Sequence, residues 1–246
     1  KVVLKYLDIE NKLESNDEFD FIIITVPFNS IKRINSNTLF SNEKLRAIDE
    51  VSLKNSQKVY LYLKERFWEK GRKNKKIIGG KTITDLPIYS IYYPSDNIKM
   101  DYDENNKEII NIKRDSNIPG VMLASCSIGD KANDFAYLSD EIKINDIIKY
   151  IERIHNLSKG YLDNILLDYK SLVWSDVQYI WGFSTMYKPE DKILYSYSSI
   201  TPEINNRVFF AGDSASTKHG TQQGELQSGI IAANNIAEEI LKKYYE

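Results

Sequence analysis

The sequence has 246 residues, of which 42% are hydrophobic and 28% charged, and its formal net charge is -2. This balance is typical of a globular chain long enough for one large or two small domains, and it gives no electrostatic reason to expect a nucleic acid or an anionic membrane as a partner. The sequence lacks an apolar run of roughly 18 residues, the length of a membrane span, and its single cysteine excludes an internal disulfide framework.

The first half of the chain is dominated by strand patterns. Alternating or continuous apolar residues, bounded by glycine, proline or polar turns, predict strands at 19–27, 57–69, 79–87 and 120–129. The first and last of these are expected to be buried. A helix is predicted over 42–51, where Leu45 and Ile48 share one face. The polar segment 95–119 is most simply a surface insertion or hairpin.

The second half contains three helix patterns. Isoleucines recur at helical spacing over 140–157, and apolar residues repeat similarly over 161–173. The last helix starts near Gln223 and carries one apolar stripe formed by Leu226, Ile230, Ala233, Ala237, Ile240 and Leu241. The fold class is therefore α/β, with α and β elements mixed along the chain (α+β mixed).

The stretch RVFFAGDSASTKHGTQQGELQSG (207–229) holds the most informative pattern. A strand that ends at Gly212 and a helix that starts near Gln222 gather backbone N–H groups at one helix N-terminus, which favours anions or electron-rich ligand atoms. Glycines in the loop allow a ligand to approach closely, and Asp213 is placed to accept hydrogen bonds from ligand hydroxyls. A plain strand–turn–helix connection with capping residues fits the pattern equally well.

A dinucleotide site needs a further phosphate loop. The sequence G-x-G-x-x-G does not occur, so this chain holds at most half of such a site. Two histidines and Cys126 lie far apart in sequence, which predicts no metal site, and an apolar strand around Cys126 indicates an inert buried thiol. His219 either caps the loop or touches a ligand, and the loop role is favoured.

Five blocks, in consistent order, resemble the flavin-containing amine oxidase superfamily and within it the L-amino-acid oxidases. They are FDFIIITVPFNSIKRI, KLRAIDEVSLKNSQKVYLYLKERFWE, IIGGKTITDLPIYSIYYPS, VMLASCSIGDKANDF and FAGDSASTKHGTQQGELQSG. The resemblance implies the C-terminal part of an FAD-linked amine oxidase fold. Residues 1–34 and 176–246 would form the second half of the FAD-binding domain, and 35–175 a substrate-binding domain with a mixed sheet plus helices.

The same resemblance implies FAD as cofactor and a companion for this chain. The family binds FAD between an N-terminal Rossmann half and the C-terminal motif, and the Rossmann half is not in this sequence. We expect it on an upstream segment or on a companion chain, and oligomer formation stays open.

Lys58 matches the family lysine that holds a water near the flavin, which makes it the predicted catalytic residue; a solvated strand lysine is the alternative. Trp174 matches the tryptophan that packs beside the flavin, although a core tryptophan is the alternative, and Tyr179 or Trp181 could take that place. Matches to the flavin-binding positions complete the predicted cofactor site, which comprises Trp174, Gly182, Gly212, Asp213, Gly220, Thr221, Gln222 and Gln223.

The resemblance implies oxidation of an L-amino acid to a 2-oxo acid, ammonia and hydrogen peroxide. Cys126, Trp181 and Thr221 take positions expected to contact the substrate. Cys126 stands where these oxidases commonly have a tyrosine that binds the substrate carboxylate, and Thr221 where they often have a tryptophan. These departures leave open an amine or polyamine oxidase, a flavin dehydrogenase, and a subunit that kept the fold without the chemistry.

Overall fold

The computed structural model describes residues 1–34, 39–51, 53–71, 76–105 and 109–245. The chain forms two compact units: residues 1–54 together with 175–246 (unit 1), and residues 55–174 (unit 2). Residues 35–54, expected in the substrate-binding domain, lie in unit 1. Whether the units have the roles of the expected domains stays a prediction.

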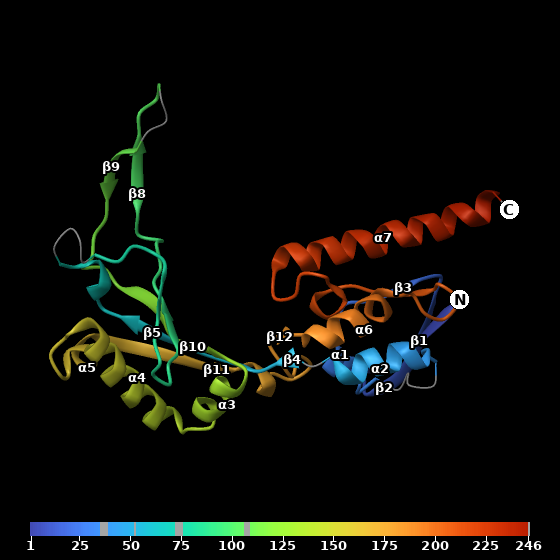
Figure 1. Ribbon diagram of the computed structural model, residues 1–246, viewed down its shortest axis with the longest axis horizontal. Helices are drawn as coiled ribbons and strands as arrows, with labels where there is room; N and C mark the ends of the chain where they lie inside the picture. The colour runs from blue at the N-terminus through green and yellow to red at the C-terminus, as the bar shows by residue number, and fades with distance from the viewer. Residues whose placement is uncertain (35–38, 52, 72–75, 106–108, 246) are drawn as a thin grey trace. The chain divides into compact units, whose positions relative to one another are not determined.

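Unit 2 is built on a five-stranded antiparallel sheet in the order β11-β5-β10-β7-β6. Its strands are β5 (Ser56–Leu63), β6 (Lys81–Ile83), β7 (Ser90–Tyr92), β10 (Gly120–Ile128) and β11 (Leu166–Val173). Its helices are α3 (Asp130–Ala136), α4 (Asp140–His155), α5 (Tyr161–Ile165) and the 3-10 turn η1 (Phe67–Glu69). A ribbon of β8 (Lys99–Tyr102) and β9 (Ile109–Lys113) extends from it, as the polar segment 95–119 predicts (Figure 1).

Strand alternation places the core of unit 2 on one face of the sheet. Val59, Leu61 and Leu63 of β5 are fully buried and pack in one cluster with Ile147 and Ile151 of α4. Each such side chain contributes about 1.5–3 kcal/mol on burial. Because side chains alternate along a strand, Lys58 of β5 lies on the opposite face of the sheet, away from this core. The strand and helix predicted at 57–69 and 140–157 are confirmed, except that the strand ends at Leu63.

The helix predicted over 161–173 is wrong beyond α5. From Leu166 the chain becomes β11 and pairs with β5 along its length. This pairing satisfies the backbone of an edge that would otherwise be open, and tertiary pairing of this kind overrides a helical spacing of apolar residues. Trp174 follows directly in the 3-10 turn η3 (Trp174–Asp176).

Unit 1 is centred on two parallel strands, β3 (Ile22–Ile24) and β13 (Val208–Phe210). The side chains of β13 alternate between two clusters: Val208 and Phe210 pack with residues of α1 (Phe28–Ile31) and α2 (Asn42–Glu50), and Phe209 packs with Ala232 of α7 (Gln222–Tyr245). The remaining elements are the hairpin β1 (Val2–Asp8) and β2 (Leu13–Phe19), the pair β4 (Leu53–Lys54) and β12 (Ser184–Thr185), α6 (Pro189–Ile200) and the 3-10 turn η4 (Asp213–Ala215).

The strand predicted at 19–27 is confirmed but short, and it is only half-buried. Ile23 of β3 is 41% exposed. The predicted helix stripe of α7 is also exposed, with Leu226 at 67% and Ile230 at 62%. The buried face of α7 is instead a narrow row of small residues, Gly224, Ser228 and Ala232. Unit 1 thus presents apolar groups from both its sheet and its longest helix to solvent.

Candidate functional site

The predicted site residues fall into two groups, one in each unit. Unit 1 holds Trp181, Gly182, Gly212, Asp213, Gly220, Thr221, Gln222 and Gln223, and unit 2 holds Lys58, Cys126 and Trp174.

The carboxylate of Asp213 ties three segments of unit 1 together. Its Oδ2 accepts hydrogen bonds from the backbone N–H of Thr185 at 2.5 Å and from Ser184 Oγ at 3.3 Å, and its Oδ1 accepts one from the N–H of Gly220 at 2.6 Å. Hydrogen bonds to an ionised acceptor are about twice as strong as neutral ones. The side chain therefore joins the end of β13 to β12 and to the start of α7.

The side chain of His219 also makes a contact that stabilises the loop between β13 and α7. Its Nδ1 lies 2.7 Å from the backbone oxygen of Asp213, so that nitrogen carries the proton, and its ring centroid lies 4.5 Å from that of Tyr187. These contacts support the loop-capping role of His219. Gly220 has φ +68°, a conformation in which a side chain is strained, and this explains the glycine at the loop's end.

Thr221 is the N-cap of α7. Its Oγ1 accepts a hydrogen bond from the N–H of Gly224 at 3.2 Å and donates one to the backbone oxygen of Lys218 at 2.8 Å. A tryptophan at this position could not accept such a bond, because its ring N–H only donates. Gln222 and Gln223 follow as the first helical residues, where the helix dipole is positive.

A hollow of about 650 Å³ lies where the strands of unit 1 end and α7 begins. It is lined by Thr25, Ala211, Gly212, Gln222, Glu225, Leu226, Gly229, Ile230 and Ala233. A methyl group added at Gly229 would meet nothing within 4 Å, so the glycine leaves room on this side of the helix. The hollow combines apolar walls with a polar end at Gln222 and Glu225. This lining suits a ligand that has an apolar part and a polar part.

Glu225 is a charged residue of the hollow that the sequence did not single out. The side chain is exposed, but partial desolvation at the edge of the hollow raises the pKa of its carboxyl group, and the charge of nearby Asp213 raises it further. Its position three residues after Gln222 places both side chains on one helical face, which is the signal that could have identified it. Two carboxylates thus lie close together at the start of α7.

Trp181 and Gly182 lie in the turn before β12. The side chain of Asn29 donates a hydrogen bond to the backbone oxygen of Trp181 at 2.8 Å, and the guanidinium of Arg33 lies 4.0 Å from the centroid of its ring. A Cβ atom at Gly182 would come within 2.5 Å of Leu53 Cβ, so packing alone requires the glycine. The cofactor and substrate roles of these two residues stay predictions.

Lys58, Cys126 and Trp174 occupy one region of unit 2. In the sheet register Lys58 pairs with Cys126 of β10 on one side and with Leu172 of β11 on the other. The side chains of Lys58, Cys126 and Leu172 therefore form a row on the face of the sheet away from the core. The Nζ of Lys58 lies 5.8 Å from the centroid of Trp174. Burial raises the pKa of the Cys126 thiol, which the charge of Lys58 partly opposes, and the raised pKa favours the neutral thiol over the nucleophilic thiolate.

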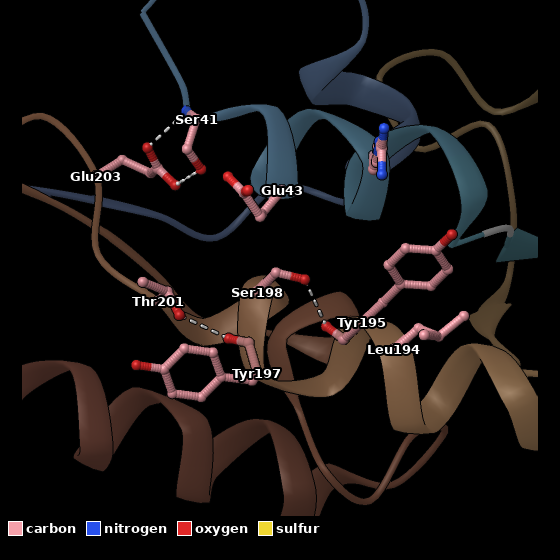
Figure 2. A pocket seen from close by; sticks show the side chains of 9 residues that line it. Ser41, Glu43, Leu194, Tyr195, Tyr197, Ser198, Thr201 and Glu203 are labelled. Carbon is pink, nitrogen blue, oxygen red and sulfur yellow. Dashed lines mark hydrogen bonds between the residues drawn. The ribbon is translucent and has the colours of Figure 1, made fainter.

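A second depression of unit 1, with a volume of about 440 Å³, lies between α2 and α6 (Figure 2). Figure 2 shows the carboxylate of Glu203 bound to Ser41, whose N–H and Oγ donate at 2.9 and 2.7 Å.

Lys44 of α2 is fully buried. Its Nζ donates a hydrogen bond to the Ser199 carbonyl at 2.8 Å and lies 3.6 Å from the Phe210 ring centroid. Burial lowers the pKa of Lys44 to about 7. These contacts hold α2 and α6 together, and none of the predicted site residues lines this depression.

In the described ranges of the chain, histidine, cysteine and acidic side chains do not form a group of three or more arranged to hold a metal ion. The helices in those ranges also do not combine the length and the apolar character that crossing a bilayer requires.

The chain is similar to known proteins in sequence and in structure. The model of the family described as flavin containing amine oxidoreductase matches residues 1–237. The protein named "Putative L-amino-acid oxidase YobN" of Bacillus subtilis (strain 168) is 34% identical over 223 residues, which are 88% of this chain and 41% of that protein. The L-amino-acid oxidase of Vipera ammodytes ammodytes is 28% identical over 238 residues, 96% of this chain and 44% of that protein.

Solved structures of putrescine oxidase share the fold. The structure with bound putrescine superposes with a TM-score of 0.64 at 17% sequence identity, over 88% of this chain and 42% of that one. The chain therefore spans about two fifths of the length of the relatives it matches.

Proposed function

The chain belongs to the family of flavin-containing amine oxidoreductases, and from that membership we propose that it is part of an FAD-dependent enzyme that oxidises an L-amino acid. The reaction consumes molecular oxygen and water, and its products are a 2-oxo acid, ammonia and hydrogen peroxide. The relatives named as L-amino-acid oxidases, at 28% identity for the viper protein, support this substrate class.

The observation that carries the proposal is the fit between unit 1 and one part of a flavin nucleotide. The hollow at the start of α7 has apolar walls for an aromatic ring system, and the space beside Gly229 would accept a flat group. The first N–H groups of α7 point out of the helix end, where they stabilise electron-rich atoms. A pyrophosphate loop has no counterpart in the sequence, so the fit covers only part of the cofactor.

FAD, when bound, would supply the oxidant, because its ring accepts a hydride, which carries two electrons, from the α-carbon of the amine. The residues of this chain would position the reacting groups and stabilise the charge that develops on them. The dipole of α7 stabilises negative charge at its N-terminus, and Thr221 fixes that end through its two hydrogen bonds. Lys58, whose Nζ lies 5.8 Å from the centroid of the Trp174 ring, would orient a water molecule through its ammonium group. The half-buried setting of Lys58 keeps that group partly shielded from bulk solvent.

We also propose that unit 1 is completed by a companion segment that carries the phosphate loop. The chain covers about two fifths of its relatives. In the described part of unit 1 the central sheet has two strands, and Ile23 at the sheet and Ile240 and Leu241 near the end of α7 are exposed. A small parallel sheet with apolar groups in solvent is stabilised when further strands and helices cover it.

A second candidate substrate is an amine without a carboxylate. Cys126 offers a buried thiol where a hydroxyl would be needed to bind a carboxylate, and the hydroxyl of Thr221 is already used in the helix cap. Both observations leave these positions without a carboxylate-binding group.

The test is spectroscopic and then enzymatic. The complete enzyme, expressed with its companion segment, is expected to show flavin absorption and to release peroxide with L-amino acids but not with primary amines or polyamines. Peroxide release with amines alone would select the second candidate, and an enzyme without flavin would refute both. We also expect the 246-residue chain by itself to bind no FAD in a fluorescence titration, and stoichiometric binding would contradict the companion proposal.

A further inference from the structure

Unit 2 contains a pocket of about 300 Å³ between the loop 84–89 and the helices α3 and α4, which we call the α3–α4 pocket. Phe135 of α3 lines it and belongs to the core of unit 2, and Leu86 of the loop lines it and packs against that core. The pocket therefore lies on the core side of the sheet, whereas Lys58 lies on the opposite face. Its volume is at the lower end of the range of about 300–1,000 Å³ for small-molecule sites, which fits a compound as small as a single amino acid.

Charged side chains of both signs line the α3–α4 pocket. Asp85 of the loop and Asp146 of α4 bring carboxylates, and Lys131 of α3 brings an ammonium group. The Nζ of Lys131 lies 4.5 Å from the centroid of the Tyr89 ring, which holds the ammonium group close to the loop. Asp146 forms an ion pair with Lys149 at 3.2 Å, but both side chains are partly exposed, and such a pair is weak enough to be exchanged for a ligand.

The loop that carries Asp85 is held in one shape. The backbone N–H of Thr84 donates to the oxygen of Tyr89, and the N–H of Tyr89 donates to the oxygen of Leu86, each at 2.9 Å. Tyr89 has φ +56°, a conformation that a bulky residue keeps only where the surrounding structure enforces it. The loop and the ring beside Lys131 are thus in place before a ligand arrives, and a preformed site saves the free energy of ordering its groups.

We propose that the α3–α4 pocket binds a free α-amino acid that has an apolar side chain. The ammonium group of the ligand binds the carboxylates of Asp85 and Asp146, and its carboxylate binds Lys131. The apolar side chain of the ligand contacts Phe135 and Leu86. An amine would bring no negative charge to Lys131, and a carboxylic acid would bring no positive charge to the two aspartates. The charges of the pocket therefore favour a compound that carries both groups.

The test is an NMR titration of the 246-residue chain, in which the amide signals of α3 and of the loop 84–89 report binding. Three probes differ in their charged groups: L-leucine, 3-methylbutylamine, which lacks the carboxylate, and 4-methylpentanoate, which lacks the ammonium group. L-leucine is expected to bind at least about tenfold more tightly than either analogue, because each analogue loses one charge-assisted contact. Glycine should also bind more weakly than L-leucine, because it brings no apolar side chain to Phe135.

Variants of the pocket assign each charge to its partner. Lys131→Met should lower the affinity for L-leucine about tenfold and leave the affinity for 3-methylbutylamine unchanged. Asp85→Asn combined with Asp146→Asn should weaken the binding of both ammonium compounds but not that of 4-methylpentanoate. The matched controls are Lys159→Met and Asp163→Asn, which make the same exchanges at exposed positions of unit 2 outside the pocket lining and should leave every Kd unchanged.

Three results would overturn the proposal. They are unshifted amide signals at every ligand concentration, equal affinity for L-leucine and 3-methylbutylamine, and an affinity for L-leucine that the pocket variants leave unchanged. Lys58→Met should not alter the Kd for L-leucine, and a loss of binding in that variant would place the amino acid on the other face of the sheet and refute the assignment. The proposed function is tested separately, because flavin absorption of the complete enzyme does not depend on this pocket.

Discussion

Two glycines of α7 allow one substitution to be compared at two positions. At Gly224 a Cβ atom would come within 2.3 Å of the backbone oxygen of Lys218 and 2.5 Å of Ser216 Oγ, whereas at Gly229 it would meet nothing within 4 Å. Exchange of glycine for alanine inside a helix stabilises it by about 1 kcal/mol. Gly229→Ala should show this gain in full.

At Gly224 the gain is outweighed by overpacking, which costs about 1–3 kcal/mol when the neighbours must move. The atom in the way belongs to the backbone of the loop that Asp213 and His219 hold closed, so it cannot rotate aside. Gly224→Ala should therefore be less stable than Gly229→Ala by about 1–3 kcal/mol.

The assay is thermal unfolding of the 246-residue chain followed by circular dichroism. A difference of this size separates the two Tm values by several degrees, at roughly 2–4 °C for each kcal/mol in a chain of this length. If Gly224→Ala were as stable as Gly229→Ala, the close packing of the loop against the helix would be refuted. In the complete enzyme, Gly229→Ala should weaken FAD binding although it stabilises the chain, because its methyl group enters the hollow.

Two further predictions concern lysines. Lys58→Met in the complete enzyme should slow turnover about tenfold or more while the Tm of the chain stays within about 1 °C, as expected for a group that acts on the reaction and not on the fold; unchanged turnover would make Lys58 a surface group. The pKa of Lys44, lowered to about 7, means that the folded protein binds this proton less tightly than the unfolded chain. Wild-type stability in urea should therefore rise by about 2 kcal/mol between pH 7 and 9 relative to Lys44→Met, and parallel pH profiles would contradict the burial of a charged amine.

The elements with strong periodicity could be predicted from the sequence. The helical spacing of the isoleucines in α4 and the alternation of Val59, Leu61 and Leu63 each predict one buried face. The structure confirms both. The stretch from Leu166 onward could not be predicted, because its apolar residues fit a helix and only the neighbouring strand β5 decides for a strand. Local spacing gives no information about an edge that lies about a hundred residues earlier in the chain.

For the candidate site, the resemblance led to the family, and the strand and helix predicted on either side of the loop are present as β13 and α7. The contacts of individual residues needed the structure. Thr221 as a helix cap and Asp213 as a clamp depend on the backbone N–H groups that face them, which no spacing rule identifies. Glu225 could have been found from its place one turn after Gln222, but an acid in the first turn of a helix is also an ordinary stabilising feature.

The division of unit 1 into two stretches of chain sets the order in which the protein can fold during synthesis. Ile22, Ile23 and Ile24 of β3 leave the ribosome early, but their partners Val208, Phe209 and Phe210 follow only after all of unit 2 has been made. Unit 2 is one continuous stretch and can fold by itself as it emerges. Until β13 has been made, β3 lacks the strand with which it pairs in this chain, and its apolar residues can pair with another chain.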